Sequence, residues 1–257
     1  MSILDRGSDW LVADKPAGQL VHPTRPGGPP TMWDELRGYY AFELVNGWRL
    51  SIINRLDRET SGCVLVATTA AAARRLGLAM RRRQLGKEYL ALVGGWPEWE
   101  QASCDQPLLR RAAVDPAAAT WVEQIVHPDG ASASTRVAVV WRGRWRARRI
   151  ALLRCHPQSG RMHQIRVHLA HLGHPVVGDK LYFDGVQPYL EFVAAGWSPR
   201  LDQRIWLRRQ ALHSHAISFP EASGARRRVE SPLPAELAQL APPLPEFSGS
   251  ISVNSSK

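Results

Sequence analysis

The residues best suited to chemistry lie in one short run, residues 54–67, with the sequence NRLDRETSGCVLVA. Its carboxylate, Asp57, stands between Arg55 and Arg58, and nearby cations favour the ionised form of a carboxyl group. Small residues at 60–62 suit a tight turn, and the apolar residues after them are typical of a buried strand. The alternative is a surface aspartate in weak ion pairs. A loop that presents a carboxylate among cations, supported by a core strand, suits a site that meets a polyanion.

A second polar run, GRMHQIRVH, occupies residues 160–168 and leads into HPVVGDKLY at residues 174–182. Its pattern predicts a helix over about residues 162–172, ended by Gly173. His168 and His171 would be neighbours on that helix, which raises the hypothesis of a metal site. The carboxylates and cysteines that complete a typical zinc set are absent at the usual spacing. Metal binding is therefore the less favoured interpretation.

Three further segments combine strand or helix patterns with aromatic or basic residues. Residues 87–93, KEYLALV, alternate as a strand that carries Tyr89, although a strand aromatic usually belongs to the core. A helix predicted over residues 69–84 carries five arginines between positions 74 and 83 with no acid among them, which favours a phosphate-facing surface over a solvated face. In a regular strand, Arg142, Arg144, Arg146 and Arg148 would share one face. A charged edge strand and an RNA-binding strip are equally good interpretations of that face.

These motifs resemble those of the RluA-type pseudouridine synthases, in the same order along the chain. Arg-Leu-Asp-x-x-Thr-Ser-Gly matches residues 55–62, Lys-x-Tyr-Leu-Ala matches residues 87–91, and Gly-Arg-x-His-Gln-Ile-Arg-Val-His matches residues 160–168. Asp-Lys-Pro-x-Gly and Val-His-Pro lie at residues 14–23, and His-Pro-x-x-Gly-Asp-x-x-Tyr lies at residues 174–182. The resemblance extends over residues 10–219. One departure from the family pattern is Asn54, where histidine is common.

The resemblance implies an isomerase that converts a uridine in RNA to pseudouridine, by cleaving the glycosidic bond, turning the base and forming a carbon–carbon bond. The target base must be flipped out of its stack. It implies that Asp57 is the catalytic carboxylate, as nucleophile or as base on the ribose. Tyr89 would lie against the uracil and would act as the base that takes the carbon-5 proton, or assist that base. Arg166 would pair with Asp57. The expected substrate-binding residues are Arg55, which could fill the space left by the flipped base, and Arg58, Arg81, Arg82, Arg161, His163 and Gln164.

Composition is consistent with a folded protein that has a polyanionic partner. The chain has 257 residues, a hydrophobic fraction of 44% and 10 tryptophans, which argue against a disordered chain. Its formal charge of +10 points to a polyanionic partner, and charge alone allows either nucleic acid or an acidic membrane surface. The resemblance implies that this partner is RNA, ribosomal or transfer. Three cysteines without a Cys-x-x-Cys pair, and no apolar run of membrane length, favour a reduced cytoplasmic protein. We expect a monomer that uses neither a cofactor nor a metal, because the implied reaction has no redox step or group transfer.

A competing function from another class is a catalytically inert RNA-binding protein with the same fold. The net charge and the arginine clusters would suffice for it. A metal-dependent nuclease is a third, less favoured hypothesis. The trio Asp57, Tyr89 and Arg166 favours the enzyme, because RNA binding alone does not require it.

The elements that must position these residues predict a mixed α/β (α+β) fold with a largely antiparallel sheet and flanking helices. We expect one catalytic domain over residues 1–241, a flexible tail over residues 242–257, and no room for the N-terminal RNA-binding domain that many relatives carry. Thr31 should cap a helix that extends to about residue 45. Strands are expected at residues 121–126, 134–141 and 145–155, with Asp129-Gly130 turning the first pair. Residues 188–209 resemble a variable insert, and residues 212–219 a closing strand.

Overall fold

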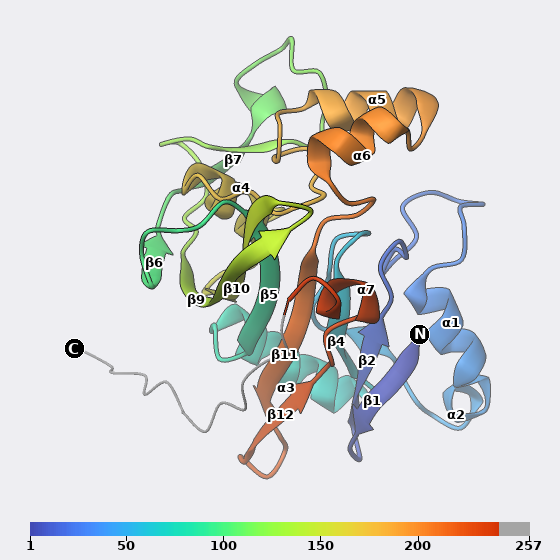
Figure 1. The fold of residues 1–257 in the computed structure, drawn as a ribbon. Helices are drawn as coiled ribbons and strands as arrows, with labels where there is room; N and C mark the ends of the chain where they lie inside the picture. Colours follow the sequence, from blue (N-terminus) through green and yellow to red (C-terminus); the bar gives the residue numbers. More distant parts are fainter. Residues whose placement is uncertain (242–257) are drawn as a thin grey trace.

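The computed structural model describes residues 1–241, and within them ten strands form one sheet (Figure 1). The expected tail over residues 242–257 lies outside the described residues. The strand order is β1-β2-β4-β11-β5-β10-β9-β6, with β3 beside β4 and β12 beside β11. β11 runs parallel to β4 and the other pairs are antiparallel, which confirms the largely antiparallel sheet. The strands of this sheet are β1 (Ser2–Arg6), β2 (Trp10–Lys15), β3 (Ser51–Ile52), β4 (Ser61–Ala67), β5 (Gly86–Gly94), β6 (Gln101–Cys104), β9 (Thr135–Trp145), β10 (Arg148–Pro157), β11 (Leu212–Pro220) and β12 (Arg226–Glu230).

The remaining elements surround this sheet and form a small second sheet. The second sheet pairs β7 (Leu108–Arg110) with β8 (Gln124–Val126). The helices are α1 (Met32–Tyr39), α2 (Ala41–Val45), α3 (Ala70–Arg81), a 3-10 turn (Arg111–Ala113), α4 (Gln164–His171), α5 (Gln187–Ala195), α6 (Pro199–Ile205) and α7 (Ala235–Ala238). In Figure 1, α5, α6 and β7 gather at one end of the large sheet, while α3 crosses the opposite end. Among residues 1–241, no helix combines the length and the apolar character needed to cross a membrane.

β4 is the strand on which the Asp57 loop rests, and all of its residues are buried. Its side chains alternate between two cores: Val64 and Val66 pack in the cluster that contains α1 residues, and Leu65 and Ala67 pack in the cluster that contains α3 residues. A strand covered on both faces has a continuous apolar sequence rather than an alternating one. The apolar run after Gly62 in the sequence is explained by this double burial.

β11 enters the sheet late in the chain and lies between β4 and β5. Ser214 of β11 pairs with Gly62 on one side and with Tyr89 on the other. Gly62 has a φ of +110°, and a Cβ there would lie 2.2 Å from the carbonyl oxygen of Ser214, so only glycine fits this close approach. Two strand spacings, about 10 Å, therefore separate the backbone of Gly62, at the end of the Asp57 loop, from the backbone of Tyr89.

Helices begin and end close to the expected positions, with two differences. Thr31 and Thr69 cap α1 and α3 through their side-chain oxygens. The helix expected over residues 31–45 divides at Tyr40, whose φ of −106° leaves the helical region while its buried ring packs against Trp48. α4 begins at Gln164, later than expected.

The hairpin expected around Asp129-Gly130 is wrong. β8 pairs with β7 rather than with β9, and Gly130 lies against the backbone of Leu108. The pairing depends on a segment about fifteen residues upstream, which turn signals in the local sequence do not reveal.

The regular strand expected through Arg142, Arg144, Arg146 and Arg148 is also wrong. β9 ends at Trp145, and Arg146 and Ala147, with φ of 47° and 62°, form a two-residue turn before β10. Positive φ at both central residues matches the twist of antiparallel strands. The four arginines therefore lie around the tip of a hairpin and not on one strand face.

Candidate active site

The loop that presents Asp57 is held by its neighbours through the backbone. The amide of Thr60 donates to the carbonyl oxygen of Asp57 at 3.1 Å, which closes the turn. Lys15, at the end of β2, is fully buried and donates its Nζ to the carbonyl oxygen of Arg58 at 3.1 Å, and Gly18 N donates to the same oxygen at 2.8 Å. Burial lowers the pKa of Lys15 to about 7, and the charge of Asp57 opposes that shift. The Lys-Pro-x-Gly segment thus fixes the backbone just after the carboxylate.

Asn54, the departure from the family pattern, is directed toward β4. Its Nδ2 donates to the carbonyl oxygen of Cys63 at 3.2 Å, and its Oδ1 accepts from the amide of Leu65 at 2.8 Å. The residue is 3% exposed. Its amide therefore joins the start of the Asp57 loop to the core strand, and asparagine supplies both the donor and the acceptor that this junction uses.

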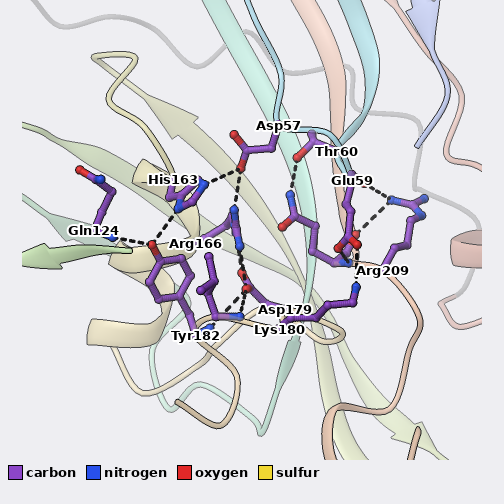
Figure 2. A network of polar contacts seen from close by, with 12 residues as sticks. Asp57, Glu59, Thr60, Gln124, His163, Arg166, Asp179, Lys180, Tyr182 and Arg209 are labelled. Atoms are coloured by element: carbon purple, nitrogen blue, oxygen red, sulfur yellow. Dashed lines mark hydrogen bonds and ion pairs between the residues drawn. The ribbon is translucent and has the colours of Figure 1, made fainter. Parts of the chain in front are cut away.

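Arg166, in the first turn of α4, connects two carboxylates, as Figure 2 shows. Its Nη1 donates to Oδ2 of Asp57 at 2.9 Å, while Nε and Nη2 donate to the two oxygens of Asp179 at 2.6 and 2.8 Å. Burial disfavours the guanidinium charge, but Asp179 and then Asp57 outweigh burial and raise the pKa of Arg166. The contact with Asp57 that the resemblance implies is present, and Asp179 makes the pair a buried triad.

The same triad keeps Asp57 ionised. Burial alone would raise the pKa of this carboxyl, but Arg166 and then His163 outweigh burial and lower it. The Asp57 side chain is 31% exposed, whereas that of Arg166 is 7% exposed. The carboxylate is therefore accessible from one side and neutralised from the other.

His163 and Tyr182 complete the surroundings of Asp57 and Arg166. His163 lies at the start of α4 with a left-handed backbone, φ 56°, and its Nε2 is 4.0 Å from Oδ2 of Asp57. Its Nδ1 lies 2.8 Å from Oη of Tyr182, and that oxygen accepts a hydrogen bond from the amide of Gln124 at 2.9 Å. Arg166 lies 5.0 Å above the centre of the Tyr182 ring. The ring of Tyr182 therefore supports both residues that approach Asp57.

Tyr89 lies on β5 and is 8% exposed. Burial raises the pKa of its hydroxyl, contact with the Ser214 side chain opposes that shift, and the charge of Asp57 raises the pKa further. The hydroxyl is consequently protonated at neutral pH. The sheet register brings Tyr89 to the same region as Asp57 through Ser214 and Gly62.

Three of the exposed residues expected to bind RNA lie on the Asp57 loop and in the turn before α4. Arg55 and Arg58 are exposed on the Asp57 loop, and the charge of Arg55, after burial, lowers the pKa of His22. Arg58 donates Nε to the carbonyl oxygen of Gly18 at 3.0 Å. Arg161 is exposed and donates Nε to the carbonyl oxygen of Ser132 at 3.2 Å.

Gln164 has a different environment from the other expected substrate-binding residues. It is 4% exposed, and its Nε2 donates to the carbonyl oxygen of Ser134 and to Oγ1 of Thr135. Its Oε1 accepts from Ser159 Oγ at 2.7 Å and from Arg161 N at 3.1 Å. These bonds use both amide hydrogens and both acceptor sites. We therefore assign Gln164 to holding the turn before α4 rather than to contacting RNA.

Arg81 and Arg82 are exposed at the C-terminal end of α3. This end of the helix approaches the turn before α4, since a Cβ on Gly160 would lie 4.0 Å from Cε of Met80. Lys87 donates Nζ to the carbonyl oxygen of Ser159 in the same turn at 2.8 Å. The basic end of α3 is therefore next to the segment that carries Arg161.

Several residues of this site were not singled out by the sequence pattern. Asp179 and Tyr182 lie in the HPVVGDKLY run, but their partners are 13 and 19 residues upstream in another element. Lys180 donates Nζ to Glu59 at 2.6 Å and so braces the Asp57 loop from its other side. The sequence signal that could have identified Asp179 was its position directly after Gly178, within the HPVVGDKLY run that resembles a family motif.

His168, which raised the metal hypothesis, is committed to hydrogen bonds. Its Nδ1 lies 2.9 Å from Oγ1 of Thr135 and its Nε2 lies 3.0 Å from the carbonyl oxygen of Gln106. Within residues 1–241, no three histidine, cysteine or carboxylate side chains gather at metal-binding distance. His168 is a buried structural histidine.

Comparison with known proteins agrees with this geometry. A model of the RNA pseudouridylate synthase family matches residues 9–171. The chain is 31% identical over 247 residues to ribosomal large subunit pseudouridine synthase D of Haemophilus ducreyi, covering 93% of this chain and 69% of the relative. It is 32% identical over 249 residues to the protein of the same name from Xanthomonas campestris pv. campestris, covering 96% and 70%. The solved structure of human RNA pseudouridylate synthase domain containing 1 superposes with a TM-score of 0.68 at 27% identity, covering 90% of this chain and 82% of that one.

The chain belongs to the RNA pseudouridylate synthase family. It is an isomerase of RNA, a pseudouridine synthase, as the resemblance in its motifs implied. The matched region ends at residue 171, whereas β11 lies in the middle of the sheet at residues 212–220. The fold is therefore completed by residues beyond the part that the family model matches.

Proposed function

We propose that this protein converts a uridine of large-subunit ribosomal RNA to pseudouridine, with Asp57 as the catalytic carboxylate. The observation that carries the assignment of Asp57 is its environment: an ionised carboxylate, open on one side and paired with buried Arg166 at 2.9 Å on the other. The relatives named for ribosomal large subunit RNA support the substrate class. We further propose that residues 1–241 form one catalytic domain, since β11 joins its halves.

Asp57 acts first, on the ribose of a base flipped into the cleft. The carboxylate either attacks the anomeric carbon, with the electron pair of the glycosidic bond leaving on the uracil, or removes a ribose proton as that bond breaks. Arg166 contacts Oδ2 of Asp57, and the other oxygen, Oδ1, points away from Arg166 and His163 in Figure 2, so we propose that Oδ1 is the oxygen that reacts. The uracil then turns, and carbon 5 bonds to the anomeric carbon as the ester bond to Asp57 breaks or, on the second route, as Asp57 returns the proton to the ribose.

Tyr89 participates in the last proton transfer. The proton on carbon 5 must leave and N1 must gain one, so the isomerisation is balanced without a cofactor. Because the pKa of Tyr89 is raised, its hydroxyl is not a standing base at neutral pH. We propose that it accepts the carbon-5 proton while passing its own to a neighbouring acceptor, and that its ring packs against the uracil.

The basic rim provides the RNA surface. Arg55 and Arg58 on the loop, Arg161 before α4, and Arg81 and Arg82 on α3 are exposed, and a chain of formal charge +10 attracts the phosphate backbone. Arg55, directly on the Asp57 loop, is the side chain that would fill the space left by the flipped base.

The test is Asp57→Asn, assayed by tritium release from RNA labelled at carbon 5 of uridine, together with a filter-binding titration. The two side chains have similar shape, so we expect release to be abolished while RNA affinity is retained. Large-subunit ribosomal RNA and transfer RNA transcripts serve as parallel substrates, and release from the former alone supports the substrate class. Release at the wild-type rate from the variant would show that Asp57 is not catalytic. Binding without release by the wild-type protein on every RNA would favour the inert RNA-binding alternative.

A further inference from the structure

A series of polar contacts, two hydrogen bonds and one longer electrostatic contact, leads from the backbone of β8 to the proposed catalytic carboxylate (Figure 2). The amide of Gln124 donates to Oη of Tyr182 at 2.9 Å, and Oη lies 2.8 Å from Nδ1 of His163. Nε2, on the opposite side of the imidazole, is 4.0 Å from Oδ2 of Asp57. A neutral histidine carries one ring proton, so the position of that proton decides whether the ring donates to Asp57 or opposes it.

The hydrogen-bonding capacity of Tyr182 determines which ring nitrogen is protonated. Burial raises the pKa of Tyr182, so its hydroxyl keeps the proton and must donate it. The Gln124 amide already donates a hydrogen bond to Oη, so it cannot accept the hydroxyl proton. Within residues 1–241, Nδ1 of His163 is the acceptor within reach of that proton. If Nδ1 carried the proton, the Tyr182 hydroxyl would lack this acceptor and the bare Nε2 lone pair would face a carboxylate. With the proton on Nε2, the Tyr182 hydroxyl has an acceptor in Nδ1, and the ring presents a donor to the carboxylate of Asp57.

We propose that His163 is a positioning residue that presents a neutral Nε2–H to Oδ2 of Asp57, and that Tyr182, seated on the Gln124 amide, fixes this tautomer. The inference rests on the proposed role of Asp57. Arg166 and His163 both approach Oδ2, so together they orient the carboxylate with Oδ1 toward the substrate. At 4.0 Å the Nε2–H contact is electrostatic, and a small rotation of the carboxylate shortens it to a hydrogen bond.

The backbone and the surrounding charges agree with this assignment. His163 has a left-handed φ of 56°, a conformation that is unfavourable for a residue with a Cβ and that aims its ring between Tyr182 and Asp57. The charged groups that act on the ring are Arg166 from α4, Asp57 from its loop and Asp179 from the following turn. Burial, and then Arg166, lower the pKa of His163 to about 4, against the opposing effect of the two aspartates. The imidazole is therefore neutral at physiological pH, where the tautomer matters.

The proposed positioning role depends on the proton at Nε2 alone. His163→Asn and His163→Gln therefore form a matched pair, because they differ in whether a donor remains at that position. The side-chain oxygen of asparagine can occupy the place of Nδ1 and accept from Tyr182, and the amide nitrogen of glutamine can occupy the place of Nε2. Asparagine also accepts the left-handed backbone more readily than other side chains. His163→Asn therefore preserves the turn and the acceptor for Tyr182 but removes the donor to Asp57. His163→Gln retains a donor near Asp57.

The first experiment measures the tautomer directly, by long-range ¹H–¹⁵N correlation spectra of histidine-labelled wild-type protein near pH 7.5. The His163 signals are assigned by their loss in His163→Asn. We expect a protonated Nε2 and an unprotonated Nδ1 in the wild type, and a population with protonated Nδ1 in Tyr182→Phe, which keeps the ring beneath Arg166 but lacks the hydroxyl. A protonated Nδ1 in the wild type would overturn the proposal.

The second experiment separates positioning from folding by kinetics on the RNA substrate. Removing a hydrogen bond to a charged group has an effect of roughly tenfold or more, so we expect His163→Asn to lower kcat by about that factor with little change in KM. Since the Nε2–H lowers the pKa of Asp57, the acid limb of the kcat/KM profile should move to higher pH in His163→Asn and return in His163→Gln. Equal loss in both variants with an unmoved acid limb would overturn the proposal. Asp57→Asn distinguishes failure of the proposed function from failure of the proposal for His163. If that variant is active, the proposed role of Asp57 fails, whereas the tautomer measurement does not depend on activity.

Discussion

Arg166 is buried between Asp57 and Asp179, whereas Arg81, Arg82 and Arg83 are exposed at the end of α3, and their guanidinium groups have no hydrogen bond or ion pair within residues 1–241. The first arrangement satisfies a cation internally and holds one carboxylate ionised. The second leaves cations available to a polyanion, whose bound counterions they would displace. From this difference we propose that one side-chain type performs two functions here: Arg166 orients Asp57, and the exposed arginines hold the RNA. Changes in the two regions should therefore have separable effects on kcat and on affinity.

The largest expected effect follows from replacing Arg166 by Gln. Removing one partner of a buried ion pair leaves the other uncompensated, and two carboxylates would then lack their cation, so we expect a loss of about 3–5 kcal/mol in the free energy of unfolding. Tritium release should be abolished, because Asp57 loses both its orientation and the charge that keeps it ionised. Chemical denaturation and the release assay measure the two effects. Arg166→Lys is the control: it keeps the charge but not the forked geometry, and should recover part of the stability. A fully active Arg166→Gln would contradict the role of this region.

Asp179→Asn should have an intermediate effect confined to the same region. Asn keeps one acceptor for Arg166 but places the NH2 group of its amide, a donor, at the other oxygen position. The guanidinium is therefore less firmly held against Asp57. We expect kcat to fall by about ten- to a hundredfold, in the range of a lost charge-assisted hydrogen bond, with RNA affinity and its salt dependence unchanged. A variant that loses RNA affinity instead would mean that the two regions are not separable.

Reversing Arg81 and Arg82 to Glu tests the other region and should change affinity rather than chemistry. The double variant removes phosphate contacts and adds repulsion, so we expect weaker RNA binding and a log–log salt slope smaller by about 1–2. At saturating RNA, kcat should remain near the wild-type value. Filter binding from low to high salt measures the first effect and single-turnover release measures the second. An unchanged affinity at every salt concentration would identify this end of α3 as an ordinary solvated face.

The matched charge reversal at the β9–β10 hairpin should have the smallest effect. Arg144 donates to the carbonyl oxygen of Ala147 at 2.9 Å and lies over Trp96, and Arg146 contacts Asp202 at 3.2 Å and lies over Trp145. Arg144→Glu with Arg146→Glu should therefore reduce stability by about 1 kcal/mol or less and reduce RNA affinity less than the α3 double variant. An equal or greater loss of affinity would show that the hairpin, too, contacts RNA.

The site could be predicted from sequence where its residues belong to contiguous motifs. The Asp57 loop, the strand of Tyr89 and the helix of Arg166 each have a recognisable local pattern, and their resemblance to one family implied that the three would meet. Turn residues, caps and apolar runs are encoded within a few neighbours. Thr31 and Thr69 therefore cap their helices as expected, and the strand after Gly62 is buried as expected.

The roles of Asp179, Tyr182 and Gln164 were not predictable in this way. Asp179 and Tyr182 matter because they contact Arg166 and His163 across a turn, and the amide of Gln164 is already hydrogen-bonded to Ser134, Thr135 and Ser159. Whether a polar side chain is free depends on partners brought close by strands distant in the sequence. The failed hairpin at Asp129-Gly130 has the same origin, since β8 pairs with β7.

By itself the sequence determined the class of fold, the family and the basic character of the protein, because these depend on residue types and on local spacing. Only the tertiary structure decided which arginines remain available to RNA and which are satisfied internally. The runs at 74–83 and 142–148 look equally basic, yet the hairpin arginines meet carbonyl oxygens, tryptophan rings and acids of other segments. A charge acts on an external partner only when the folded chain has not neutralised it, and that depends on long-range contacts.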